Sequence, residues 1–246
     1  LSYDEIWPKT LEEIKEISAN TIVIGFFGDD NWRFEDWSRY YAPFFNYILT
    51  SEKDTSFYER EGFNNAQFLH GVSQSVFHKD KKIKQIYDMT FVGMPIRDRA
   101  DYIKYLKNKG FKLRVFGRGW EKYPELNEVY GGFLETDKYV DLINETKINL
   151  SFSKTLLEEK GKKNTQLKGR LFEVGACNAF ILVENFEDFK LFFPKSPEIT
   201  FSNKEDLARK VLYYLKNEKE REKQSDKIYA QVLKEYTWEA QFTRFF

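Results

Sequence analysis

The chain has 246 residues, 41% of them hydrophobic, so it is long enough to bury one large core or two smaller ones. Lysine plus arginine and aspartate plus glutamate both count 39, and this zero net charge argues against a dedicated nucleic-acid binder, which would carry a basic excess. One cysteine excludes an internal disulfide framework and fits a reducing, cytoplasmic compartment, and the apolar runs are far too short for a transmembrane segment.

Short apolar runs alternate with helical patterns along the whole chain. The predicted strands are, in order, residues 21–27, 46–50, 90–93, 112–117, 147–152, 179–184 and 198–202. Near-continuous apolar strands separated by helices are typical of a parallel sheet that is covered on both faces. The sequence therefore predicts an α/β fold.

The predicted helices have recognisable ends. Asp98 is expected to cap a helix that ends at Lys109, and Thr136 is expected to cap the next one, because both residue types accept hydrogen bonds from free N–H groups at a helix start. A charged helix is predicted over residues 218–235.

The pattern predicts two units. Residues 1–78 are expected to form a partial N-terminal Rossmann-like unit with its linker, about half the size of a doubly wound domain. Residues 79–235 contain a fresh strand–helix–strand series and are expected to form a complete one. The aromatic-rich residues 236–246 form a tail that is expected to pack.

Two cations open the helix predicted before residues 179–184. Lys168 and Arg170 lie in its first turn, where the positive end of the helix dipole disfavours each cation by about 0.3–1 kcal/mol. A negatively charged ligand would resolve this conflict. Glu173 lies one turn further on, where it could accept hydrogen bonds from a sugar hydroxyl. The alternative is a solvated basic loop in which Arg170 pairs with Glu173.

Two strand ends carry further candidates, because ligands of open α/β sheets bind beyond the carboxyl ends of the strands. Arg97 and Arg99 follow strand 90–93 and lie within reach of a diphosphate, although Arg99 could instead pack along its own helix. The segment Gly117-Arg118-Gly119 follows the next strand. It lacks the third glycine of the dinucleotide fingerprint, so an ordinary turn is the alternative.

The first predicted strand ends at a pair of acidic residues, Asp29 and Asp30. Adjacent residues of an extended chain point to opposite sides, so the pair does not make a metal site. A strand-end carboxylate could bind substrate or act as a base, or it could cap the following turn. We find no metal-binding motif and no nucleophile elbow, and we expect neither a metal nor a cofactor.

Several motifs occur in a fixed order: Thr-Phe-Val-Gly at 90–93, Val-Phe-Gly at 115–117, Tyr-Gly-Gly at 130–132, Lys-Ile-Asn-Leu-Ser-Phe at 147–152 and Lys-Gly-Arg-Leu-Phe-Glu at 168–173. Together they resemble the C-terminal half of group-1 glycosyltransferases of the GT-B type, in the CgeB-like (spore-maturation-protein-B-like) branch. The resemblance implies two Rossmann-like units and metal-independent transfer from a nucleoside-diphosphate sugar. The acceptor is unknown: a glycan, a protein or a small molecule.

The resemblance also implies roles for the candidate residues. Arg99 and Lys168 would hold the donor diphosphate with the help of Arg170, and Glu173 would grip the nucleotide ribose as the second residue of a paired-glutamate motif. The expected catalytic residues are Asp29 and Lys168. The residues expected to bind the donor or its nucleotide are Gly93, Arg97, Arg99, Gly117, Ser153, Lys168, Arg170 and Glu173.

The chain departs from the family pattern in two ways. The first glutamate of the pair should lie eight residues before Glu173, where this chain has Thr165, and the N-terminal unit lacks its opening strands. Because the chain begins with Leu1, we expect a fragment or a processed chain. The missing opening strands indicate either a piece of a longer protein or a reduced or inactive form. A non-catalytic nucleotide-sugar-binding module and a sugar-nucleotide epimerase are the alternative functions. The resemblance implies as well that residues 236–246 pack back on the N-terminal unit.

Overall fold

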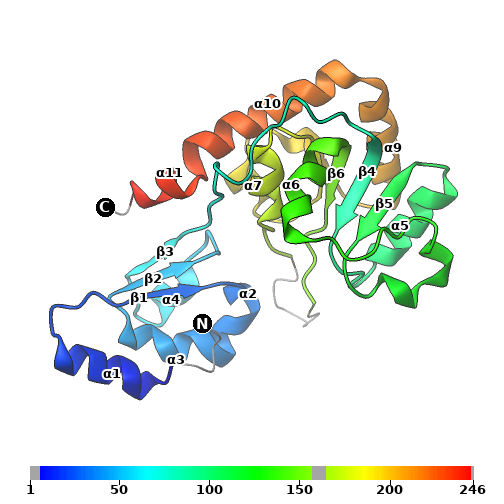
Figure 1. Ribbon diagram of the computed structural model, residues 1–246. Helices are drawn as coiled ribbons and strands as arrows, with labels where there is room; N and C mark the ends of the chain where they lie inside the picture. Colours follow the sequence, from blue (N-terminus) through cyan, green and yellow to red (C-terminus); the bar gives the residue numbers. More distant parts are fainter. Residues whose placement is uncertain (1–5, 157–164, 245–246) are drawn as a thin grey trace. The chain divides into compact units, whose positions relative to one another are not determined.

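The computed structural model describes residues 6–156 and 165–244. They divide into two compact units, the first ending at His70 and the second beginning at Gly71 (Figure 1). Each unit contains a parallel sheet with accompanying helices, and this confirms the predicted α/β class.

The division lies ahead of the boundary predicted after residue 78, because the intervening segment already bonds to the second unit. Val72 forms a parallel bridge with Thr237. Nδ2 of Asn144 donates to the carbonyl of His78 at 3.1 Å. The predicted linker is therefore built into the second unit.

The first unit has three parallel strands in the order β1-β2-β3. Two of them, β1 (Ile24–Phe27) and β2 (Tyr47–Thr50), confirm the predictions at 21–27 and 46–50 with shorter bounds. The third, β3 (Ala66–Phe68), was not predicted. The helical segments are α1 (Pro8–Ile17), α2 (Asp30–Arg33), the π-helical turn Phe34–Ser38, α3 (Arg39–Tyr41), the 3₁₀ turn Ala42–Phe44 and α4 (Ser56–Arg60).

Aromatic rings fill the core of the first unit. Phe27, Phe34 and Tyr58 are buried together, and the rings of Phe34 and Tyr58 meet edge to face at 4.8 Å between centroids. In β1, a Cβ atom at Gly25 would lie 2.7 Å from the ring of Phe45. The glycine therefore lets the strand approach this aromatic layer.

The second unit has five parallel strands in the order β5-β4-β6-β7-β8, which confirms all five strands predicted there. The strands are β4 (Tyr87–Val92), β5 (Leu113–Phe116), β6 (Thr146–Ser151), β7 (Ile181–Glu184) and β8 (Thr200–Phe201). The helices are α5 (Arg99–Asn108), α6 (Thr136–Glu145), α7 (Arg170–Ala176), α8 (Phe189–Phe192), α9 (Lys204–Lys216), α10 (Glu218–Glu235) and α11 (Trp238–Phe242), with short 3₁₀ turns at Trp120–Lys122, Pro124–Leu126 and Pro197–Ile199.

The predicted caps of α5 and α6 are only partly right. Asp98 is the residue before α5, but its side chain makes no capping hydrogen bond. Thr136 is the first residue of α6 rather than its cap, and Glu135 occupies the cap position without a side-chain bond. The side chain of Asp98 is instead used in an ion pair described below.

The strand order of the second unit reverses between β4 and β6, because the chain moves from β4 outward to β5 and then crosses back. Right-handed crossovers place α5 on one face of the sheet and α6 and α7 on the other. In agreement, α9 contacts α5, whereas α10 contacts α7 (Figure 1). Open α/β sheets bind ligands beyond the carboxyl ends of their strands at this reversal.

The C-terminal segment packs on α7. Tyr236 is 1% exposed, and its ring stacks on that of Phe172 with 4.5 Å between centroids. Gly175 allows α7 to approach α10, since a Cβ atom there would lie 2.8 Å from Cγ2 of Val232. Packing of the aromatic tail on the N-terminal unit stays a prediction. Within residues 6–156 and 165–244, no helix combines the length and apolarity needed to cross a membrane.

Candidate functional site

The carboxyl ends of β4 and β5 are joined by two glycines that were predicted to bind the donor. Gly93 and Gly117 have φ angles of +153° and +126°, which side chains other than glycine rarely tolerate. A Cβ atom at Gly117 would lie 2.8 Å from the carbonyl oxygen of Gly93. The same oxygen accepts a hydrogen bond from Nε1 of Trp120 at 2.7 Å. Close packing of the strand ends therefore accounts for both glycines, and a role in donor binding stays a prediction.

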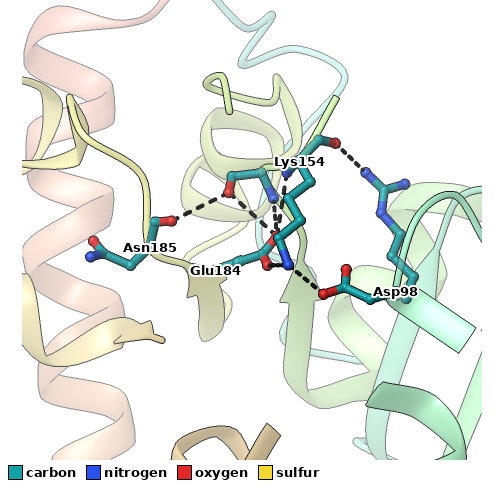
Figure 2. A network of polar contacts seen from close by, with 6 residues as sticks. Asp98, Lys154, Glu184 and Asn185 are labelled. Carbon is teal, nitrogen blue, oxygen red and sulfur yellow. Dashed lines mark hydrogen bonds and ion pairs between the residues drawn. The ribbon is translucent and has the colours of Figure 1, made fainter. Parts of the chain in front are cut away.

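A buried carboxylate terminates β7. Glu184 is 3% exposed, and its Oε2 atom accepts the backbone N–H groups of Ser153 at 3.0 Å and Lys154 at 3.3 Å. Its Oε1 atom lies 3.1 Å from the ammonium nitrogen of Lys154 (Figure 2). Ser153, predicted to bind the donor, is 1% exposed and is held by this carboxylate.

The Lys154 ammonium bridges two carboxylates. It contacts Asp98 as well as Glu184, so it connects the start of α5 with the end of β7 (Figure 2). Burial alone would lower the pKa of Lys154, but the hydrogen bonds and charges of Asp98 and Glu184 together raise it. Lys154 therefore stays charged at neutral pH. The second carboxylate oxygen of Asp98, Oδ1, is buried without a hydrogen-bond partner.

Arg99 turns into the edge of the sheet and does not lie along α5. It is 7% exposed and donates from Nη1 to the carbonyl of Met94 at 3.1 Å and from Nη2 to that of Lys154 at 3.0 Å. Its Nε atom is buried without a partner. Burial, and then the nearby charge of Arg170, lower the pKa of Arg99 to about 10. The side chain is thus a cation held in an unfavourable environment.

Arg170 is the first residue of α7 and lies over the same aromatic ring as Arg99. The guanidinium carbons of Arg170 and Arg99 lie 5.2 Å and 5.6 Å from the centroid of Phe91. Arg170 donates to the carbonyl of Val92, the last residue of β4. Two positive charges, those of Arg99 and Arg170, therefore lie where the strand order reverses between β4 and β6.

Tyr139 lies between Arg170 and Glu173. Its hydroxyl accepts from Nε of Arg170 at 3.3 Å and donates to Oε2 of Glu173 at 2.9 Å. Burial raises the pKa of Tyr139, so this donor keeps its proton. The pairing of Arg170 with Glu173 considered from the sequence is therefore indirect, through this hydroxyl.

Lys168 is half-buried and precedes α7, where its carbonyl accepts the N–H of Leu171 at 3.0 Å. Just before it, Thr165 forms an antiparallel bridge with Lys154, and the N–H of Gln166 donates to the carbonyl of Ser153 at 3.0 Å. The segment that leads to Lys168 is thus fastened to the end of β6.

The two aspartates after β1 lie in different environments. Asp30 is 1% exposed and accepts hydrogen bonds from the hydroxyl of Tyr58 at 2.8 Å and from that of Ser38. Burial raises the pKa of Asp30. Asp29 is half-buried with a φ angle of +61°, and its N–H donates to Oγ of Ser51 at 3.3 Å. The two neighbours therefore differ in burial, and a catalytic role for Asp29 stays a prediction.

The parts of the chain that the structure describes contain no group of three or more His, Cys, Asp or Glu side chains placed to hold a metal ion. Cys177 is 1% exposed, and burial followed by the charge of Glu173 raises its pKa to about 12. The thiol is therefore protonated at neutral pH. Arg97 is half-buried with a φ angle of +58° in the connection between β4 and α5.

Comparison with known proteins finds relatives of this chain. Residues 98–246 match the family model described as glycosyl transferase-like. The chain belongs to this glycosyl transferase-like family. The matched residues include Asp98, Arg99, Lys154, Glu184 and the whole segment from Lys168 to Glu173.

Members and neighbours of the family resemble the chain to different extents. Spore protein CgeB of Bacillus subtilis (strain 168) is 23% identical over 211 residues, which cover 78% of this chain and 64% of CgeB. The chain thus spans less than two thirds of the length of this relative. HepE of Anabaena, solved in complex with UDP and glucose, has a TM-score of 0.68 at 10% identity, covering 97% of this chain and 74% of HepE. Sucrose-phosphate synthase of Thermosynechococcus elongatus has a TM-score of 0.63 at 9% identity, covering 97% and 70%.

These similarities confirm the GT-B type of fold and the CgeB-like branch predicted from the sequence. The second unit brings Arg99, Arg170 and Glu173 of the predicted site residues to one edge of its sheet. Sequence analysis missed Glu184, Lys154 and Tyr139 as site residues. Glu184 had one usable signal, since a carboxylate ending a continuous apolar run falls at the carboxyl edge of a buried parallel strand.

Proposed function

We propose that the protein is a cytoplasmic glycosyltransferase that takes a sugar from a nucleoside-diphosphate donor and needs no metal ion. The observation that carries this proposal is the pair of cations at the strand-order reversal. Both guanidinium groups lie over the ring of Phe91, and burial, followed by the nearby charge of Arg170, lowers the pKa of Arg99. A diphosphate would add negative charge beside these two cations.

Fixed cations can do the work of a metal in such a transfer. The developing charge on a leaving diphosphate is stabilised by groups already in place, so no reorganisation is needed during reaction. In the proposed mechanism Lys168 contacts the diphosphate directly, because it is half-buried and lies at the start of α7. Arg99 and Arg170 act mainly through their charge, since both Nη atoms of Arg99 and Nη2 of Arg170 already bond to carbonyl groups.

Glu173 is proposed to bind the ribose. Its Oε2 atom is held by Tyr139, which leaves Oε1 to accept hydrogen bonds from the ribose hydroxyls. Asp29 of the first unit is the proposed base for the acceptor. Uridine is the first nucleoside to test, because HepE, which has a similar fold, was solved with UDP and with UDP-glucose.

Calorimetric titration with UDP, GDP and CDP tests this proposal. We expect one of them to bind, and Lys168→Ala to weaken that binding and slow turnover by about tenfold or more, a loss of about 1.4 kcal/mol. Thr165→Ala, a nearby change without a charge, should have a far smaller effect. Failure of all three nucleotides to bind, or equal losses in the two variants, would contradict the proposed diphosphate site.

Thr165 favours one second candidate, a non-catalytic nucleotide-sugar-binding module, because the family pattern places a carboxylate there. Both functions predict nucleotide binding. Only the enzyme releases free nucleoside diphosphate when it is mixed with donor and acceptor, so nucleotide release distinguishes the two.

A further inference from the structure

We infer that Glu184 is a positioning residue for donor binding, which acts by fixing the segment that carries Lys168. The inference rests on the proposed function. The negative charge of Glu184 alone would weaken the binding of an anionic donor. We assign Glu184 the opposite effect, which is to strengthen donor binding.

The contacts of Glu184 point to the backbone of one segment. Its Oε2 atom accepts two consecutive backbone N–H groups, those of Ser153 and Lys154, at 3.0 and 3.3 Å. Its Oε1 atom contacts the Lys154 ammonium at 3.1 Å. Glu184 is only 3% exposed, so water cannot easily replace these contacts.

The fastened segment is in turn paired with the approach to Lys168. The carbonyl of Ser153 accepts the N–H of Gln166 at 3.0 Å, and Lys154 bridges to Thr165. Lys168 follows three residues after Thr165 and its carbonyl begins the turn into α7. The position of Lys168 is therefore set by this pairing. Glu184 in turn holds the other side of the pairing, which is formed by Ser153 and Lys154.

Lys154 also connects Glu184 to Arg99. Its ammonium contacts Asp98, and its carbonyl accepts Nη2 of Arg99 at 3.0 Å. One residue, Lys154, thus links Glu184 to both cationic elements, the start of α5 and the segment before α7. Figure 2 shows its ammonium between Glu184 and Asp98.

Charge and position make opposite predictions for Glu184→Gln. If Glu184 acts only as a nearby negative charge, its removal makes the site more positive and strengthens binding of a diphosphate. If it acts by position, the change places an amide against the Lys154 ammonium, loosens the pairing and weakens binding. A purely structural role would weaken binding of every ligand alike.

The test is a double-mutant cycle on UDP affinity, measured by calorimetry in the full chain. We expect Glu184→Gln to weaken UDP binding about tenfold, to leave uridine binding unchanged, and to have no further effect in the Lys168→Ala background. Glu187→Gln is the matched control, because it removes the same charge from an exposed residue three positions further along. Amide hydrogen exchange should accelerate at Ser153, Lys154 and Gln166 in Glu184→Gln alone.

Tighter UDP binding by Glu184→Gln, or additive losses in the double variant, would overturn the inference while Lys168→Ala still supports the proposed function. Absence of UDP binding by the unmodified chain would overturn the UDP-based proposal and this inference together. If Glu184→Gln does not fold, Lys154→Met and Lys154→Arg replace it: the first should weaken UDP binding and the second should retain it, and equal behaviour of the two would contradict the positioning role.

Discussion

Two buried carboxylates, one in each unit, stand close to the carboxyl end of a parallel strand and have different partners. Asp30 of the first unit is 1% exposed and Glu184 of the second is 3% exposed. Asp30 accepts hydrogen bonds from two neutral hydroxyls, whereas Glu184 accepts two backbone N–H groups and contacts an ammonium group.

The difference teaches how a buried charge is used. Hydroxyl donors do not offset the burial of Asp30, so its pKa is raised. The charge of Glu184 is compensated by the Lys154 ammonium, and the carbonyl of Lys154 accepts a hydrogen bond from Arg99. Glu184 is therefore connected to the neighbouring cations. Asp30 instead connects two helical segments of the first unit, because Ser38 comes from one and Tyr58 from the other.

Removing the carboxylate of Glu184 is the strongest way to test this comparison. Glu184→Leu leaves two backbone N–H groups without their buried acceptor and leaves the Lys154 ammonium with Asp98 alone. Loss of one partner from such a group costs about 3–5 kcal/mol of stability. The free energy of unfolding of the second unit in urea should fall by this amount, and an unchanged value would contradict the buried ion pair. Glu187→Leu controls for the loss of an exposed charge.

A smaller effect is expected from Tyr58→Phe in the first unit. The variant keeps the ring in its aromatic cluster and removes only the hydroxyl that donates to Asp30. A buried acceptor left with one donor fewer costs about 1–3 kcal/mol. Amide hydrogen exchange in β1 should report a loss in this range. Tyr47→Phe, at an exposed tyrosine of β2, should show no comparable loss.

The smallest expected effect is a pH dependence carried by Asp30. Its pKa is raised above the usual 3.8, so the folded chain keeps this proton to a higher pH than the unfolded chain does. Between about pH 4 and the raised pKa the folded state binds more protons, and its stability from this group falls as pH rises. Asp30→Asn does not titrate, so its stability relative to the unmodified chain should improve from pH 4 to pH 7 in urea unfolding. The reverse trend would contradict the conclusion that the hydroxyl donors do not offset the burial of Asp30.

The fold was largely predictable because its strands are local patterns. Seven apolar runs were recognised as strands, and each overlaps a strand of the structure. The exception is β3 (Ala66–Phe68), which follows two asparagines typical of a turn and contains Gln67. Its only strong determinant is pairing with β2, which local sequence does not encode.

The site was predictable in its cations and not in the groups that hold them. Arg99 and Arg170 were recognisable because each begins a helix that follows a strand, and Glu173 was recognisable because it lies in the first turn of α7. Their partners come from distant segments: Lys154 lies 55 residues from Arg99, and Tyr139 lies 34 from Glu173. Such contacts depend on strand order in the sheet, which single-sequence patterns do not specify.

The stacking of Tyr236 on Phe172 ties the end of the chain to the helix that carries Glu173. The carbonyl of Tyr236 also accepts the N–H of Val72 at 2.9 Å, so one residue fastens both the first and the last segments of the second unit. Removal of Tyr236 would therefore weaken binding at the proposed nucleotide site from a distance, so chains used for binding studies should keep this residue.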